Sequence, residues 1–216
     1  MTRIKFCGIT RPEDAARAQT LGATHVGAIL CESPRRIQPE DARIMFDAAP
    51  SLRHVAVFRR SPIATVLHDA RISGADVLQL HGHFSVDEIT QLREAFDGEI
   101  WTVIPVEIRQ AGISEDWDHL ADLTDAALLD TSAQGHTGGT GIAFDWVASK
   151  DIVAQVALRT TVVLAGGLNA GNVGEAIRIL SPDIVDVSSG VESAPGVKDP
   201  KLMQAFADAV RSASMV

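Results

Sequence analysis

Short apolar segments alternate with longer amphipathic segments along the whole chain. Eight of the apolar segments are rich in Val, Ile and Leu and show little polar alternation. This pattern is typical of strands that are buried on both faces, as in a parallel sheet. We expect these strands near Ile4–Cys7, His25–Leu30, His54–Phe58, Val77–Leu80, Ile100–Val106, Ala126–Leu129, Thr161–Leu164 and Ile184–Val187.

The amphipathic segments between these strands predict helices. In Arg11–Thr20, Pro12 stands near the start and Gly22 follows the end, which is the usual arrangement of helix start and stop signals. The segment Arg109–Leu123 predicts a loop and a short helix. The remaining helices are expected at Pro39–Ala49, Ile63–Ser73, Val86–Phe96, Trp146–Leu158, Gly171–Leu180 and Pro200–Ser212.

Repeated strand–helix units indicate a parallel sheet, and eight of them in one compact chain favour a closed barrel. We therefore expect an α/β protein, a single-domain (β/α)8 TIM barrel over residues 1–216, near the small end for that fold. An open doubly wound sheet is the alternative. Against it, no G-x-G-x-x-G segment follows the first strand.

Composition narrows the range of partners. The net charge of −9 argues against a nucleic-acid partner, which needs a clustered basic face. No apolar run reaches the roughly 18 residues of a membrane span, and the N-terminus lacks a signal-peptide layout, so we expect a cytoplasmic protein without a membrane partner. Its two cysteines, Cys7 and Cys31, are expected to be thiols there.

In a barrel of this kind the active site lies at the carboxyl ends of the strands. Gly166 and Gly167 follow the seventh strand, and Ser188, Ser189 and Gly190 follow the eighth. Loops at these two positions often bind phosphate, and glycines let backbone N–H groups approach it closely. Tight turns alone would also explain the glycines, but two such turns at the expected strands favour a phosphate site.

Two reactive side chains end strands that lie across the barrel from each other. Cys7 ends the first strand, and Asp130 follows the sixth. A cysteine is often a small buried residue, whereas a carboxylate at such a place must be solvated, paired or catalytic. Flanking a bound substrate, the two would suit a base–acid pair for proton transfer.

Other polar residues at the strand ends are candidates for substrate binding. Arg35 and Arg36 follow the second strand, and one guanidinium could hold a carboxylate, while the other belongs to a solvated turn. His81, after the fourth strand, is either a pocket residue or a structural histidine. No convincing set of metal ligands stands out, so no metal is expected.

These segments resemble the phosphoribosylanthranilate isomerase family, whose motifs occur here in family order from end to end. Lys5–Thr10 reads K-F-C-G-I-T where the family usually has K-I-C-G-I-T. The other matching segments are Ser33–Arg35, Gln79–Gly82, Leu128–Asp130, Gly138–Gly141, Phe144–Trp146, Ala165–Leu168, Asp186–Glu192, Pro195–Gly196 and Lys198–Asp199.

The resemblance implies an Amadori rearrangement of N-(5-phosphoribosyl)anthranilate, a small phosphorylated substrate, in tryptophan biosynthesis, without metal or organic cofactor. By analogy, Asp130 is the general acid that opens the ribose ring, and Cys7 is the general base that removes the adjacent C–H proton. Arg35 is implied to contact the anthranilate carboxylate. His81 and Asp186 are expected beside the substrate, and the active-site loop contains Gly138, Gly139, Thr140 and Gly141. Family members occur as monomers and as homodimers.

The sequence departs from the family pattern near the expected anthranilate pocket. The segment Leu30–Ser33 is shorter than usual, and Arg36 replaces a common aromatic residue. A barrel isomerase of the histidine pathway is one rival, but those enzymes usually have Asp where this chain has Cys7. A non-catalytic phosphate-binding barrel is another, although binding alone requires neither Cys7 nor Asp130. Cys31 is expected beside Cys7, where oxidation could join them in a disulfide.

Overall fold

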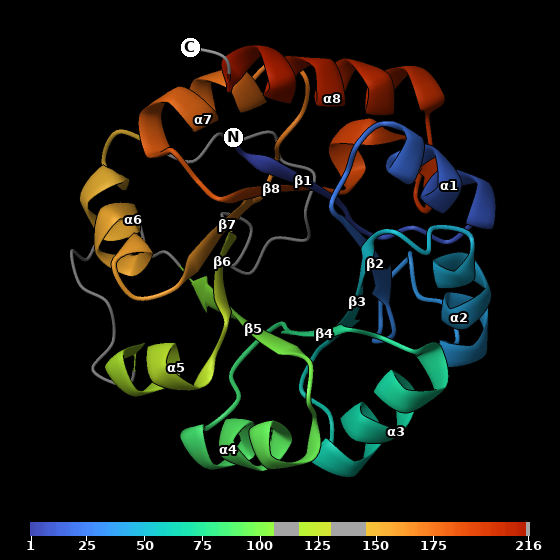
Figure 1. Cartoon of the computed structure of the whole chain (residues 1–216), viewed down its shortest axis with the longest axis vertical. Helices are drawn as coiled ribbons and strands as arrows, with labels where there is room; N and C mark the ends of the chain where they lie inside the picture. The colour runs from blue at the N-terminus through green and yellow to red at the C-terminus, as the bar shows by residue number, and fades with distance from the viewer. Residues whose placement is uncertain (106–116, 131–145, 215–216) are drawn as a thin grey trace.

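A closed barrel of parallel strands forms the centre of the molecule (Figure 1). The structure, a computed structural model, describes residues 1–105, 117–130 and 146–214. The barrel order follows the chain order from β1 to β8, with β8 closing onto β1. The strands are β1 (Arg3–Phe6), β2 (His25–Ile29), β3 (Arg53–Phe58), β4 (Val77–Leu80), β5 (Glu99–Pro105), β6 (Ala126–Asp130), β7 (Thr161–Ala165) and β8 (Ile184–Val187).

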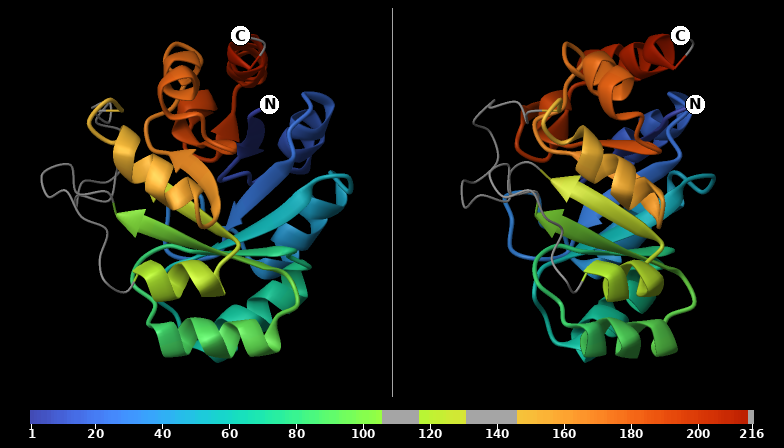
Figure 2. Two further views of the ribbon diagram at one scale, coloured as in Figure 1. Left: turned by 60° about the vertical axis from the view of Figure 1, so that its left-hand side comes forward. Right: turned by 90° about the vertical axis from the view of Figure 1, so that its left-hand side faces the viewer.

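Helices surround the barrel on its outside, between consecutive strands (Figure 2). Thr2 donates its backbone N–H to the Ser214 hydroxyl over 3.3 Å, so the two ends of the chain meet beside α8. The helices are α1 (Pro12–Thr20), α2 (Pro39–Asp47), α3 (Ile63–Ser73), α4 (Val86–Ala95), α5 (Trp117–Leu123), α6 (Lys150–Ala157), α7 (Val173–Leu180) and α8 (Pro200–Ala213). The predicted (β/α)8 barrel is confirmed.

Side chains along each strand point alternately out of and into the barrel, and this creates two separate apolar regions. Outward side chains form one core with the helices, and inward side chains form another inside the barrel. Trp101, Leu128 and Val163 belong to the inner core and are almost fully buried. Because successive side chains face opposite sides, a residue's position along its strand decides whether it reaches the barrel interior.

Two helices begin two or more residues later than the sequence predicts. α6 begins at Lys150 rather than Trp146, and residues 146–149 form turns. α7 begins at Val173 rather than Gly171 because asparagine side chains organise the preceding turn. The Asn172 side-chain oxygen accepts the Asn169 backbone N–H over 2.8 Å, and its amide nitrogen donates to the Gly167 carbonyl over 3.0 Å.

A small hairpin that the sequence analysis did not predict follows β8. It comprises a short 3-10 turn, η1 (Ser189–Val191), and the antiparallel strands β9 (Glu192–Ala194) and β10 (Val197–Lys198). The Thr10 hydroxyl donates to the Gly196 carbonyl over 2.6 Å, which fixes the hairpin to the loop after β1. The hairpin therefore carries Glu192 and Lys198 to the carboxyl end of the barrel.

Candidate active site

The carboxyl ends of three strands bring the main predicted residues to one rim. Cys7 immediately follows β1, Asp130 is the last residue of β6, and His81 immediately follows β4. Cys7 is buried, whereas Asp130 and His81 are half-buried. The inward direction of each follows from strand alternation, since Lys5, Leu128 and Gln79 stand two residues earlier on the same faces.

A buried ion pair lies one layer below Cys7, inside the barrel. Lys5, which is fully buried, donates to the Asp186 carboxylate over 2.9 Å, and its charge also acts on the Cys7 thiol, two residues further on the same face. The pair forms because β1 and β8 align Lys5 opposite Asp186. The other carboxylate oxygen of Asp186 is buried without a hydrogen-bond partner among the described residues. Asp186, predicted to bind substrate, therefore lies beneath the rim and faces Lys5.

Burial and nearby charges shift the pKa of the Cys7 thiol in opposite directions. Burial raises the pKa of Cys7, and the Asp186 carboxylate adds to that effect. The Lys5 and Lys198 ammonium groups lower it, but the first two influences prevail. In this arrangement Cys7 is predominantly a thiol at neutral pH, with cations placed to stabilise a thiolate when one forms.

His81 is neutral at physiological pH. Burial lowers the pKa of its imidazole; the Asp130 carboxylate raises it, and the Arg59 guanidinium lowers it further. The ring is therefore an uncharged donor and acceptor that both the rim carboxylate and a guanidinium influence. This location fits the predicted pocket residue rather than a histidine packed in the structural core.

Arg35 lies in an ion-pair network at the rim. Its guanidinium donates to both carboxylate oxygens of Glu192, with the shortest contacts at 2.8 Å. Lys198 donates to the same carboxylate over 2.7 Å and to the Ser188 carbonyl over 3.1 Å. Although burial opposes it, these hydrogen bonds lower the pKa of Glu192. Arg35 thus reaches the rim already paired.

The turns after β7 and β8 touch each other, as the phosphate hypothesis requires. Gly166 and Gly167 both adopt positive φ, at 90° and 63°, which favours glycine. At Gly190 a side chain would overlap the Leu168 backbone carbonyl, so the two turns approach as closely as backbones can. Ser189 is exposed there. The hydroxyl of Ser188 is instead buried without a partner in the described part of the chain.

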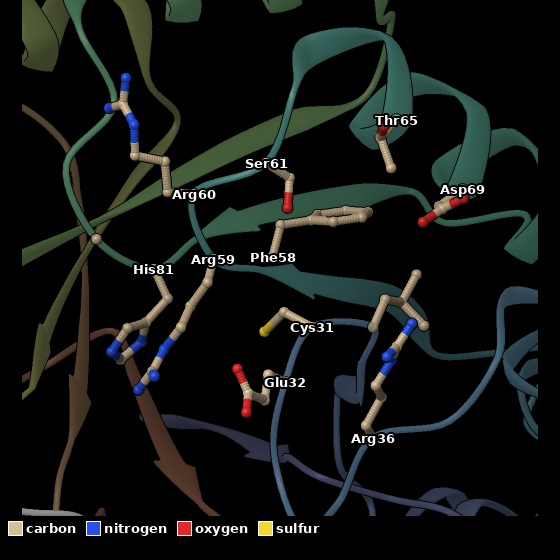
Figure 3. A pocket seen from close by; sticks show the side chains of 12 residues that line it. Cys31, Glu32, Arg36, Phe58, Arg59, Arg60, Ser61, Thr65, Asp69 and His81 are labelled. Atoms are coloured by element: carbon tan, nitrogen blue, oxygen red, sulfur yellow. The ribbon is translucent and has the colours of Figure 1, made fainter.

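A cavity of about 650 Å³ opens at the ends of β2, β3 and β4 (Figure 3). Arg59 and His81 lie side by side at one end of it, and Cys31 and Glu32 reach into it from the loop after β2 (Figure 3). Arg36 lines its other end. Arg59 forms no ion pair with any described residue, whereas Arg35 pairs with Glu192.

Some predictions fall beyond what the structure covers. The active-site loop with Gly138, Gly139, Thr140 and Gly141 lies outside the described residues. Within residues 1–105, 117–130 and 146–214, no cluster of three metal-binding side chains occurs. None of the helices in these residues is long and apolar enough to cross a membrane. Both cysteines are free, so the structure contains no bond between Cys7 and Cys31.

Four residues of this region were not predicted as site residues: Lys5, Arg59, Glu192 and Lys198. Lys5 offers a local signal, because it stands two residues before Cys7 on the same face of an apolar strand. Arg59 offers another, since it directly follows a buried strand. Glu192 and Lys198 offered none beyond the motif, because the hairpin that positions them was not predicted.

A closed barrel with a thiol, a carboxylate and touching glycine turns at its carboxyl rim defines a (β/α)8-barrel enzyme. A family profile described as N-(5'phosphoribosyl)anthranilate (PRA) isomerase matches residues 4–209. The chain belongs to this family. Isomerisation of PRA, a step of tryptophan biosynthesis, is accordingly its activity.

This chain is similar to individual members of the family over almost its whole length. The chain is 41% identical to the N-(5'-phosphoribosyl)anthranilate isomerase of Haloferax volcanii, over 99% of this chain and 95% of that protein. The solved phosphoribosyl anthranilate isomerase of Thermus thermophilus matches with a TM-score of 0.83 at 34% identity, over 98% and 99% of the two chains.

Two further solved structures add ligand and assembly information about those proteins. One is a phosphoribosyl anthranilate isomerase in complex with reduced 1-(o-carboxyphenylamino)-1-deoxyribulose 5-phosphate, with a TM-score of 0.80 and 30% identity over 98% and 100% of the chains. The other comprises monomers generated from the dimeric isomerase of Thermotoga maritima, with a TM-score of 0.81 and 32% identity over 98% and 100%.

Proposed function

We propose that the isomerisation proceeds as an acid–base Amadori rearrangement in which Asp130 is the general acid and Cys7 the general base. Asp130 protonates the ring oxygen of the phosphoribosyl group, and the ring opens to an iminium form. The iminium acidifies the adjacent C–H, and the Cys7 thiolate removes that proton to give the enol form of the product. No metal or organic cofactor enters this sequence of steps.

The observation that carries this proposal is the common placement of the two groups. Cys7 and Asp130 reach the same rim from strands separated by β7 and β8, and both face inward. A substrate between them presents its ring oxygen to one group and its C–H to the other. This arrangement also supports catalysis over simple binding, because a phosphate-binding barrel has no need of a buried thiol at its mouth.

The phosphate end of the substrate is proposed to bind at the turns after β7 and β8. Support comes from the positive φ angles of Gly166 and Gly167 and from the close approach of Gly190 to the preceding turn. Backbone N–H groups in such turns suit a phosphate. Ser189, which is exposed, is the hydroxyl proposed to donate to it, and Ser188 is proposed to contribute through its backbone.

The aromatic end is proposed to extend toward β2–β4, where the cavity in Figure 3 supplies the space. Arg35 is the proposed contact for its carboxylate, and His81 is the proposed neutral hydrogen-bonding group nearby. The Glu192 pair holds the Arg35 guanidinium in a fixed orientation, which reduces the entropy lost on binding. Loop residues Gly138–Gly141 are proposed to cover the site.

Small phosphorylated molecules are therefore the proposed partners of this chain, and neither a nucleic acid nor a membrane is proposed. The net charge of −9 supports the first exclusion. A monomer or a homodimer is proposed, the latter by analogy with the dimeric Thermotoga maritima enzyme. A cytoplasmic location is proposed because the pathway operates on small soluble metabolites.

The test is a coupled assay in which phosphoribosylanthranilate is generated in place and the loss of its fluorescence is followed under reducing conditions. We expect rapid loss with the unmodified chain and a decrease of about 10²- to 10⁴-fold in Cys7→Ser and in Asp130→Asn. Asp183→Asn is the matched control, because Asp183 accepts the Val162 N–H at the amino end of the barrel. Full turnover in Cys7→Ser would disprove the base assignment.

The same assay, run with a second substrate, distinguishes the proposed isomerase from the rival isomerase of the histidine pathway. If the folded, reduced chain isomerises the histidine-pathway ribonucleotide faster than phosphoribosylanthranilate, the proposed substrate geometry is wrong. A chain that binds the reduced product analogue but turns over neither substrate would instead be a phosphate-binding barrel, and the proposed proton transfers would be abandoned.

A further inference from the structure

Three ionisable groups meet inside the barrel with one cation among them. The Lys5 ammonium donates to the Asp186 carboxylate at 2.9 Å, and the Cys7 sulfur lies beside the Lys5 side chain, since both border the same point at Gly27. Lys5 is fully buried, and Cys7 and Asp186 are 6% and 7% exposed. Water therefore screens their charges poorly, and each group determines which ionisation state the others adopt.

The neighbouring strand is built to permit this contact. Gly27, on β2, lies beside both side chains, and a Cβ added there would stand 3.0 Å from the Cys7 sulfur and 3.4 Å from the Lys5 Cε. A side chain there would press on the Cys7 sulfur and touch the Lys5 stem. Glycine at this inward position thus leaves room for both side chains.

Charge balance limits the protonation states of the three groups. With Lys5 as the cation, an ionised Asp186 and a neutral Cys7 thiol give a neutral cluster. A Cys7 thiolate and a protonated Asp186 give the same net charge. Ionising both acids leaves an uncompensated negative charge in a dry interior, and such a charge is costly.

Asp186 is equipped to hold a proton. One of its oxygens accepts from Lys5, and the other is buried without a partner among the described residues, which is the position that an added proton would occupy. Burial raises the pKa of Asp186, and although Lys5 lowers it, the Asp130 carboxylate raises it again. Burial and the Asp130 charge therefore favour the carboxyl form of Asp186.

We infer that Cys7 and Asp186 share one proton, with Lys5 remaining charged between them as a positioning residue. The catalytic thiolate forms when Sγ loses its proton and Asp186 holds one, so that Cys–SH and Asp–COO⁻ become Cys–S⁻ and Asp–COOH. No oxidant or other reactant is consumed. The inference rests on the proposed role of Cys7 as the base, and it assigns Asp186 to tuning that base rather than to substrate contact.

Other charged groups face this cluster from several elements. The rim network is internally paired, since Glu192 accepts from both Arg35 and Lys198. The groups that act on Cys7, Lys5 or Asp186 are Lys198 from β10, Arg35 from the loop after β2, Asp130 from β6, His81 after β4 and His25 from β2.

The test is an ultraviolet titration of the Cys7 thiolate in the free protein. In a Cys31→Ser background Cys7 is the single thiol, and the chain contains no tyrosine to contribute at the same wavelengths. We expect the thiolate signal to rise in two steps, a partial one when the pair loses its first proton and a second when the shared proton leaves. A single step would overturn the inference.

Substitutions test whether Asp186 is the group that shares the proton with Cys7. In Asp186→Asn we expect one step, with the thiolate about tenfold more populated at a pH below the wild-type second step, because one pH unit is a factor of ten. Lys5→Met/Asp186→Asn should shift this step back to higher pH. Asp183→Asn, on the amino side of the same strand, is the matched control and should keep both steps. Unchanged titration in Asp186→Asn would overturn the inference.

Measurements of kcat and KM against pH test the shared proton separately from the proposed function. The acidic limb of the kcat profile should move with the thiolate titration in Asp186→Asn, while KM changes little. A KM increase without movement of the limb would return Asp186 to a substrate-binding role and overturn the inference. A chain that titrates in two steps yet isomerises no phosphoribosylanthranilate would overturn the proposed function and still support proton sharing.

Discussion

Two ion-pair clusters lie a few residues apart in this barrel, at different depths. The inner cluster, Lys5 with Asp186, is sealed inside the barrel, and one carboxylate oxygen lacks a partner among the described residues. The rim cluster joins Arg35, Glu192 and Lys198, and both Glu192 oxygens accept hydrogen bonds. Similar charges therefore have different consequences: the inner cluster is suited to tuning protonation, and the rim cluster to holding a guanidinium in place.

Removing the inner cation should have the largest effect on stability. Lys5→Met leaves the Asp186 carboxylate buried and unpaired, and we expect a loss of about 3–5 kcal/mol in the free energy of unfolding. Denaturant unfolding at neutral pH measures it. The double variant Lys5→Met/Asp186→Leu should recover most of that stability, since two apolar groups replace the pair. If the double variant were no more stable than the single one, buried charge would not explain the loss.

His25, next to the inner cluster, should make the stability of the fold depend on pH. Burial, followed by the Lys5 charge, lowers the pKa of His25 from 6.5 to about 3. The fold favours the neutral ring, so this contribution to stability is complete above pH 6.5 and is lost as the pH falls toward 3. Between pH 7 and pH 5 we expect a loss of about 2 kcal/mol in the free energy of unfolding.

Denaturant unfolding across this pH range in His25→Gln measures the contribution of that ring. The variant should show a flatter pH dependence, whereas His68→Gln, at an exposed position of α3, should follow the wild type. An equally steep profile in His25→Gln would assign the acid sensitivity to other groups.

The smallest expected effect lies at the rim. Arg35→Met leaves Glu192 paired with Lys198, so we expect a stability loss of only about 1 kcal/mol. Loss of a charge-assisted contact with the substrate carboxylate should raise KM about tenfold. Steady-state kinetics with Arg35→Met, Arg59→Met and the exposed control Arg17→Met distinguishes the guanidinium groups. A larger KM effect in Arg59→Met would transfer the carboxylate to the cavity in Figure 3.

The fold was predictable because its signals are local. All eight predicted strands agree with the structure to within one residue at each end, since a strand buried on both faces must be a short continuous apolar run. Helix starts were less predictable. The Asn169–Asn172 turn delays α7 through side-chain hydrogen bonds that periodicity does not reveal.

The site was predictable in part. Cys7 and His81 could be assigned to the rim because each follows an apolar strand, and Asp130 because it ends one. The Lys5–Asp186 pair could not be predicted in this way, because its members are 181 residues apart and meet only when β8 pairs with β1. The pairing of Arg35 likewise depends on a hairpin held by Thr10.

By itself, the sequence determined the number and order of the strands, the barrel they form, and the residues at its carboxyl rim. These follow from periodicity and from chain order, which are properties of neighbouring residues. Only the tertiary structure decided which charges are paired and how deeply they lie. Depth sets the screening by water, and screening sets the protonation of Cys7, His25 and Asp186.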